Sequence, residues 1–313
     1  MLLVVLLPNM RVNIPVLLIT YKRPDLTENL INILIKNNIE DIFIYMDGPN
    51  NSSDMANCKK TRKTIEMFSN KYPNIKTLFK DKNVGIAHGI PEAIDWVFKS
   101  FNQAIILEDD CIPSSKFFPF MEQMLIRYKP NSEIASICGS NFLSKWNLNK
   151  ENYFYSKYFN SWGWGTWKDR WQRFDRNLDN LDKIQKNKFL KTYLGSYRAY
   201  FYWHWILSKV KNRKIDTWDY TWIFTNFINK KLHITPKINL VSNIGIGLDS
   251  SHTKSYPVNY IPSSSISDEF NLSLPAPLNI VANHKFDKDV ENKIYSKSIQ
   301  NRIFWILKKI FKY

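Results

Sequence analysis

The stretch Gln103-Ala-Ile-Ile-Leu-Glu-Asp-Asp110 runs from an apolar segment directly into three consecutive acids. A short apolar run of this kind is typical of a strand that is buried on both faces of a parallel sheet. Three carboxylates after such a strand repel one another unless a cation compensates their charge. A divalent metal shared with phosphate oxygens is one such cation, because hard cations take oxygen ligands. The alternative is a solvated turn whose acids cap a helix near Ser114.

Similar apolar runs alternate with helical patterns through the first half of the chain. Strands are predicted over 14–20, 41–46, 75–79 and 103–107, and helices over 25–36, 53–71 and 90–101. This alternation is typical of an α/β fold with a mostly parallel sheet and helices on both faces. Ligands bind at the carboxyl ends of the strands in such sheets. We therefore expect the ligand-binding and catalytic residues to lie directly after Thr20, Asp47, Phe79 and Leu107.

Composition limits the class of protein. The 313 residues include 44 Lys and Arg against 28 Asp and Glu, a formal charge of +16 that favours anionic surfaces and phosphorylated ligands. Cys58, Cys111 and Cys138 have no close spacing, which excludes a disulfide scaffold or a zinc ribbon and indicates a reducing compartment. The longest apolar run, Met1–Leu7, is far shorter than the ~20 residues that span a bilayer and predicts a first strand or a frayed end. We expect a cytoplasmic protein.

Three regions differ in pattern. Residues 10–145 carry the strand–helix alternation, 146–255 are dense in Trp and Tyr, and 256–313 hold a loop and a basic tail. The Ser/Pro-rich stretch from Gly247 to Pro277 predicts a loop or lid. Residues 302–313 have helical periodicity, with apolar side chains on one side and lysines on the other. This amphipathic segment suits either an anionic membrane surface, such as the inner membrane face, or packing on the domain.

Two aromatic segments carry candidate functional residues. In Ser161-Trp-Gly-Trp-Gly-Thr-Trp167, glycines between indoles either expose flat faces on which a sugar packs or form a buried aromatic loop. Trp218 precedes Asp219, where partial desolvation would raise the pKa of the carboxyl group and suit it to act as a base. Asp216 is the competing carboxylate.

Four further residues are candidates by position. Arg23 follows the first predicted strand, where a guanidinium can meet a phosphate or a base. Asp47 ends the second strand and is either an acceptor for a ribose or base, or an ordinary turn residue. His88 lies near a helix start and has a structural role as its alternative, and His252 in the late loop is placed to reach a metal or a diphosphate.

Taken in order, these features resemble the GT-A nucleotide-sugar glycosyltransferases, in particular the N-acetylglucosaminyltransferase I family (glycosyltransferase family 13) and its bacterial relatives. The resemblance covers residues 14–255 and is most specific over His88–Phe118, where Glu108-Asp109-Asp110 looks like that family's version of the metal-binding DxD motif. It implies a GT-A (Rossmann-like) fold in which Asp110 and His252 hold Mn²⁺ (or Mg²⁺). The nucleotide-sugar contacts that it implies are Thr20, Arg23, Asp47, His88, Glu108, Asp109, Trp164 and Ser251.

The same resemblance implies an activity. It is the transfer of a sugar, with a UDP-sugar expected as donor, to a hydroxyl of a glycan or lipid-linked glycan in bacterial surface-glycan synthesis. Asp219 matches the family's catalytic base, so that one displacement inverts the anomeric centre. Residues 10–145 would bind the nucleotide-sugar, and 146–255 would form the acceptor half of the same domain. The family's W-D-D-W becomes Trp218-Asp-Tyr-Thr-Trp222 here, with one insertion and one lost acid.

Two other functions fit parts of the sequence. A sugar-nucleotide nucleotidyltransferase shares the sheet, but such enzymes usually carry a glycine-rich loop after the first strand, and 20–24 contain no glycine. A non-enzymatic membrane- or nucleic-acid-binding protein would fit the charge of +16. Nucleic-acid binding predicts an affinity that falls steeply with salt and does not depend on Mn²⁺. We expect no nucleic-acid partner.

Overall fold

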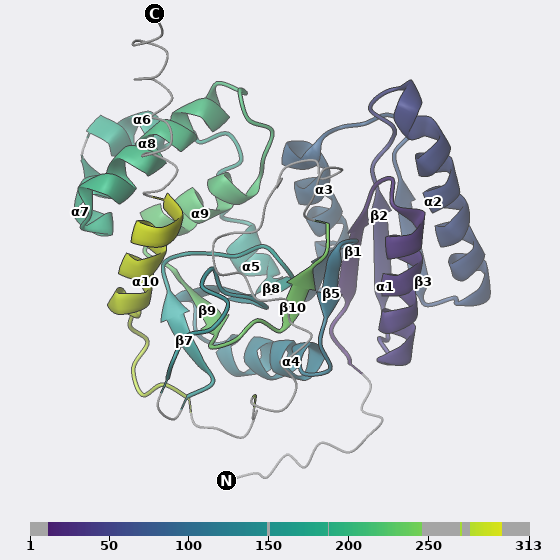
Figure 1. Ribbon diagram of the computed structural model, residues 1–313, viewed down its shortest axis with the longest axis horizontal. Helices are drawn as coiled ribbons and strands as arrows, with labels where there is room; N and C mark the ends of the chain where they lie inside the picture. The colour runs from purple at the N-terminus through teal and green to yellow at the C-terminus, as the bar shows by residue number, and fades with distance from the viewer. Residues whose placement is uncertain (1–11, 149–150, 187, 246–269, 271–275, 296–313) are drawn as a thin grey trace, which may run out of the picture.

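The fold is built around one large sheet. The computed structural model describes residues 12–148, 151–186, 188–245, 270 and 276–295. Its eight-stranded sheet has the order β3-β2-β1-β4-β8-β6-β9-β7, and a two-stranded sheet pairs β10 with β5 (Figure 1). The strands are β1 (Val16–Thr20), β2 (Ile42–Met46), β3 (Ile75–Phe79), β4 (Gln103–Glu108), β5 (Cys111–Pro113), β6 (Ile134–Cys138), β7 (Tyr153–Ser156), β8 (Trp164–Trp167), β9 (Leu232–Pro236) and β10 (Val241–Asn243).

Helices cover both faces of this sheet. They are α1 (Pro24–Lys36), α2 (Ser52–Lys71), α3 (Ile86–Phe98), α4 (Phe117–Tyr128), α5 (Lys168–Trp171), α6 (Leu181–Lys186), α7 (Phe189–Leu194), α8 (Tyr197–Lys211), α9 (Asp219–Ile228), α10 (His284–Val290) and the π-helical turn η2 (Glu291–Tyr295). One core joins β1 and β2 to α1, α2 and α4, and a second joins the other face to α3, α8, α9 and α10. Figure 1 shows α6, α7, α8 and α10 grouped on the side of the molecule away from α1 and α2.

The strand pairings confirm the α/β class with a mostly parallel sheet. The pairs β1–β2, β2–β3, β1–β4 and β6–β9 are parallel, and β8 runs antiparallel between β4 and β6. The predicted strands over 14–20, 41–46, 75–79 and 103–107 appear as β1 to β4 within two residues at each end. The side chains of β1, β2 and β4 are buried almost throughout, which explains their apolar sequences, whereas in β3 only Ile75 is buried.

The third helix begins earlier than its apolar pattern predicts. The sequence places this helix over 90–101, whereas α3 spans Ile86–Phe98. Gly85 at the N-cap has φ +78°, and the backbone N–H groups of Ile86 and Ala87 donate to the two carboxylate oxygens of Asp216 at 3.1 and 3.0 Å. A carboxylate supplied by a distant segment therefore caps the helix start, where unpaired N–H groups favour negative charge.

The aromatic half of the chain supplies strands that its sequence does not indicate. The stretch from Trp146 to Trp222, which is dense in Trp and Tyr, contributes β7 and β8 to the main sheet, and β9 follows it. The indole of Trp164 in β8 is 1% exposed and stacks on Trp218 at 5.3 Å between ring centroids. Within the segment Ser161–Trp167, Trp164 and Trp167 thus match the buried aromatic alternative, because strand pairing on both sides of β8 draws their indoles into the core.

Some predicted segments lie outside the described residues. These are the apolar run 1–7, the Ser/Pro-rich lid apart from Phe270, Ala276 and Pro277, and the amphipathic tail 302–313. Cys58, Cys111 and Cys138 are buried free thiols. Among the residues that the structure describes, no helix has the length and apolar character needed to cross a membrane.

Stability should depend on pH through His233 in β9. Its ring is completely buried, with Nδ1 2.7 Å from Ser136 Oγ, and burial lowers its pKa to about 3. An unfolded histidine gains its proton near pH ~6.5, so the folded chain loses free energy of unfolding as the pH falls from there, by up to ~1.4 kcal/mol per pH unit. Urea unfolding measured at about pH 7.5 and about pH 5 should show that the free energy of unfolding falls less between these two pH values for His233→Gln than for the wild type. An equal loss in both proteins would contradict this account.

Candidate functional site

The ends of β1 and β4 meet in an ion-paired cluster. These strands are parallel neighbours with Ile19 opposite Glu108, so the residues that follow them lie together. Arg23 Nη1 donates to Asp109 Oδ1 at 3.0 Å and to Asp110 Oδ2 at 2.6 Å. Pro24 starts α1 directly after Arg23, because proline suits the first helical turn, and this start places the guanidinium at the strand end. The structure thus brings Arg23 and the acidic triplet together.

The cluster carries more negative than positive charge. Burial, reinforced by repulsion from Asp110 and Asp109, raises the pKa of Glu108 to about 8. Burial likewise raises the pKa of Asp109 to about 6, although the charge of Arg23 opposes this shift. Burial would lower the pKa of Arg23, but attraction by the two aspartates outweighs it and the pKa is raised. With a pKa of about 8, Glu108 is largely protonated at neutral pH, so one guanidinium faces the charges of two aspartates and a further cation would be favoured here.

A short segment after β10 folds over Asp110. Asn243 pairs with Cys111 across the small sheet, and its side-chain Nδ2 donates to Asp110 Oδ1 at 3.3 Å. The next backbone N–H, of Ile244, donates to the Asp110 carbonyl at 2.9 Å. Gly245 then approaches so closely that a Cβ there would lie 2.7 Å from the Asp110 Cβ and even closer to its carboxylate. Sequence reasoning missed Asn243 and Gly245; the available signal was a Gly-Ile-Gly run in a chain with only 9 glycines.

Asp219 lies near the same cluster at the start of α9. The Thr217 hydroxyl donates to Asp219 Oδ1, as does the Tyr220 N–H at 2.8 Å. The negative charge of Asp219 contributes to the raised pKa of Glu108, which places the two carboxylates within electrostatic range. Trp218, buried against Trp164, anchors the start of the helix.

Asp47 and Asp216 hold the loop before α3. Asp47 accepts hydrogen bonds from the N–H groups of Gly48, Val84 and Gly85 and from Asn83 Nδ2, at 2.8 to 3.1 Å. A carboxylate has about four acceptor sites, so protein donors occupy those expected for a ribose or base. Burial raises the pKa of Asp47, and these bonds oppose the shift. Asp216, the competing base candidate, instead caps α3.

Three other expected contacts are placed as follows. Thr20 is buried and its hydroxyl donates to the Tyr45 carbonyl at 3.0 Å, so the side chain joins two strands. Trp164 was expected to contact the sugar, but its indole is covered by protein. His88 is exposed in the first turn of α3. Ser251 and His252 lie outside the described residues.

The donor atoms of the cluster suit a hard divalent cation. Asp109 and Asp110 offer carboxylate oxygens at a strand end, and Mg²⁺-type sites take one or two protein carboxylates together with water and phosphate oxygens. Within the described ranges, no group of three or more His, Cys, Asp and Glu side chains forms a potential metal site. The two carboxylates match the one or two protein ligands of a Mg²⁺-type site.

Comparisons with known proteins give only distant likenesses. No protein-family model matches the chain, and no curated protein does. A mannosyltransferase from Pyrobaculum calidifontis, solved with GDP-Man and Mn²⁺, is 11% identical over 69% of each chain with a TM-score of 0.40. A UDP-glucose pyrophosphorylase, solved with UDP-glucose, is 10% identical over 74% of this chain and 93% of its own, with a TM-score of 0.40. A 4-diphosphocytidyl-2C-methyl-D-erythritol synthase from Anaerococcus prevotii is 8% identical over 56% of this chain and 83% of its own, with a TM-score of 0.29.

The close approach of Gly245 to Asp110 generates a prediction. Gly245→Ala forces either Asp110 or the covering segment to move, so Mn²⁺ affinity measured by electron paramagnetic resonance should fall by about tenfold or more. Gly195→Ala is the control, because this glycine has φ +68° and open space around its Cβ position, so the substitution strains the backbone without touching the cluster. Equal Mn²⁺ affinity in the wild type and Gly245→Ala would show that this segment does not position Asp110.

Proposed function

We propose that this chain is a metal-dependent glycosyltransferase that moves a sugar from a nucleoside diphosphate donor, with a UDP-sugar expected, to an acceptor hydroxyl. One observation carries the proposal. At the carboxyl ends of two adjacent parallel strands, Arg23 bridges the buried carboxylates of Asp109 and Asp110, and Asp219 lies within electrostatic range of Glu108. This edge is where ligands bind in such sheets.

The donor's diphosphate would bind at the mixed charges of this cluster. Asp110 and Asp109 would hold the divalent cation, which neutralises negative charge on the departing nucleoside diphosphate when it is bound. Arg23 is 25% exposed and reaches both aspartates, so its planar guanidinium is placed to donate to phosphate oxygens as well. Arg23 and the bound cation would thereby offer positive charge where the leaving group develops negative charge.

Asp219 would act on the acceptor. Hydrogen bonds from Thr217 and Tyr220 orient its carboxylate at the start of α9. In the proposed step the acceptor hydroxyl attacks the anomeric carbon, its proton passes to Asp219, and the bond from that carbon to the diphosphate breaks. A single displacement of this kind inverts the anomeric centre. A glycan or lipid-linked glycan is the proposed acceptor, as in bacterial surface-glycan synthesis.

A sugar nucleotidyltransferase is the competing function, and the position of Lys22 in the loop after β1 supports glycosyl transfer. Nucleotidyl transfer needs positive charge around a triphosphate, but Lys22 Nζ lies 2.5 Å from Asp54 Oδ1, and Tyr21 also donates to Asp54 at 2.8 Å. Lys22 is thus already ion-paired with a carboxylate of α2. Release of nucleoside diphosphate from a nucleotide-sugar supports glycosyl transfer, whereas release of pyrophosphate from a nucleoside triphosphate and a sugar 1-phosphate would overturn it.

Two substitutions should separate donor binding from transfer. Asp110→Ala should abolish metal-dependent donor binding, because it removes a proposed metal ligand. Asp219→Asn should keep donor affinity within about threefold and lower kcat by about 100-fold or more, because only the proton acceptor is lost. Titration calorimetry measures the first effect and steady-state turnover the second.

Asp216→Asn is the matched control for the base. It makes the same chemical change three positions away, at a carboxylate that caps α3, so it should cost stability and leave kcat nearly unchanged. Near-normal turnover by Asp219→Asn, or a loss of turnover by Asp216→Asn as large as that of Asp219→Asn, would contradict the assignment.

A further inference from the structure

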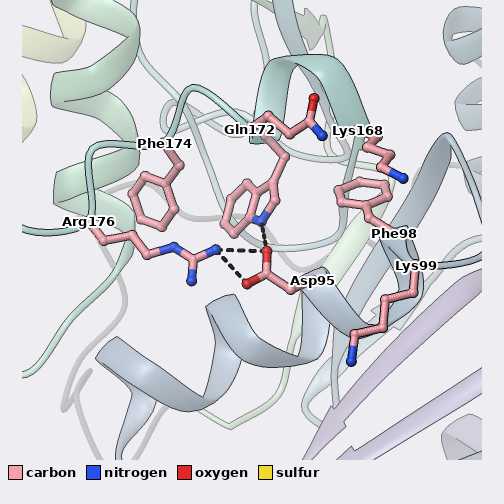
Figure 2. A pocket seen from close by; sticks show the side chains of 8 residues that line it. Asp95, Phe98, Lys99, Lys168, Gln172, Phe174 and Arg176 are labelled. Atoms are coloured by element: carbon pink, nitrogen blue, oxygen red, sulfur yellow. Dashed lines mark hydrogen bonds and ion pairs between the residues drawn. The ribbon is translucent and has the colours of Figure 1, made fainter.

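A pocket lined by charged and aromatic side chains lies at the opposite end of β4 from the acidic triplet. Its cavity of about 440 Å³ is lined by residues from the end of α3 and from α5 with the turn that follows (Figure 2). The Lys168 N–H donates to the Asn102 carbonyl at 2.9 Å, which fixes the pocket beside the first residue of β4. Six residues of strand, or roughly 20 Å, separate this end from Glu108 at the other. The pocket therefore does not belong to the cluster around Asp110.

The carboxylate in this pocket is fully engaged by the protein. Arg176 Nη2 donates to both oxygens of Asp95 at 2.7 and 2.6 Å, and Trp171 Nε1 donates to Oδ1 at 2.9 Å. A guanidinium on a carboxylate balances its charge and fixes its orientation. Asp95 and Arg176 thus form a neutral polar wall, which offers hydrogen-bonding edges and no excess negative charge.

Two lysines remain as the excess charge of the pocket. Figure 2 shows Lys99 and Lys168 on one side, with Phe98 between them, and the Asp95–Arg176 pair on the other. Over the described residues, neither ammonium group is within ion-pair distance of a carboxylate. The acid nearest to Lys168 along the chain, Asp169, is paired with Arg170 at 2.6 Å.

We propose that this pocket binds an anionic saccharide, a sugar that carries a phosphate or a carboxylate. Lys99 and Lys168 would bind the anionic group, and the Gln172 amide with the Asp95–Arg176 pair would hydrogen-bond the hydroxyls, beside the partly exposed ring of Phe174. The volume lies within the usual range for small-ligand sites, roughly 300–1,000 Å³. The anion follows from the lysines alone, whereas the choice of a sugar rests on the proposed function.

The test measures binding to the full chain by titration calorimetry without metal. Glucose 1-phosphate and galacturonate should bind with a Kd on the order of 1 mM, and glucose at least about tenfold more weakly. The double variant Lys99→Gln/Lys168→Gln should lose about tenfold in affinity for both anions. The control Lys59→Gln/Lys63→Gln removes the same charge from two exposed positions on α2 and should bind like the wild type.

Two results would overturn the proposal. One is equal affinity of the pocket variant and the wild type for both anionic sugars. The other is binding of inorganic phosphate as tight as that of glucose 1-phosphate, which would show a site for the anion without the sugar. A galacturonate tetramer shows whether the anionic sugar belongs to a glycan chain or is a free sugar phosphate. If the tetramer binds more tightly than glucose 1-phosphate, the pocket is assigned to a glycan chain. If glucose 1-phosphate binds more tightly, the pocket is assigned to a free sugar phosphate.

Measuring nucleotide-sugar binding in the same variants distinguishes a failure of the pocket proposal from a failure of the proposed function. UDP-sugar affinity in the presence of Mn²⁺ should be the same in the pocket variant, the control variant and the wild type, since the acidic cluster lies at the other end of β4. If no protein binds a nucleotide-sugar while the pocket variant still loses the anionic sugars, the proposed function fails alone. If donor binding is normal and the pocket variant binds these sugars like the wild type, the second site fails alone.

Discussion

The ion pairs from Arg23 to Asp109 and Asp110 are the interaction on which the candidate site depends. They join the loop after β1 to the end of β4, two strands whose parallel register already brings these residues together. Without a cation, the buried carboxylates would remain uncompensated, and an unpaired buried charge is strongly destabilising. In the proposed function, the divalent cation and the donor's phosphates bind at this same edge.

The aromatic half supports this edge from the other side of the sheet. The stack of Trp164 on Trp218 buries two large side chains, and Asp219 follows directly as the first residue of α9. Because β8 lies between β4 and β6, the core that holds Trp218 is continuous with the strand that ends in the acidic triplet. The tryptophans thus position a carboxylate rather than offer their own faces to a sugar.

Apolar runs in the sequence predicted the parallel strands of the first half of the chain. The apolar runs of β1, β2 and β4 can be recognised in the sequence because these strands are almost wholly buried, and the parallel pairing of β1 with β4 brings Arg23 to the triplet. Local sequence patterns did not predict the contacts between segments that are distant along the chain. Asp216 sets the start of α3 from 130 positions away along the chain, and Gly245 covers Asp110 through the pairing of β10 with β5. The placement of Trp164 inside the sheet likewise depends on strands that come from both halves of the chain.

The most direct measurement is equilibrium binding of UDP-, GDP- and CMP-sugars to the wild-type chain, with and without Mn²⁺. If the triplet grips a cation that carries a diphosphate, at least one of the two nucleoside diphosphate sugars should bind at least about tenfold more tightly with Mn²⁺. CMP-sugars have a single phosphate and should gain much less. Equal affinities with and without the metal for all three donor classes would contradict the account.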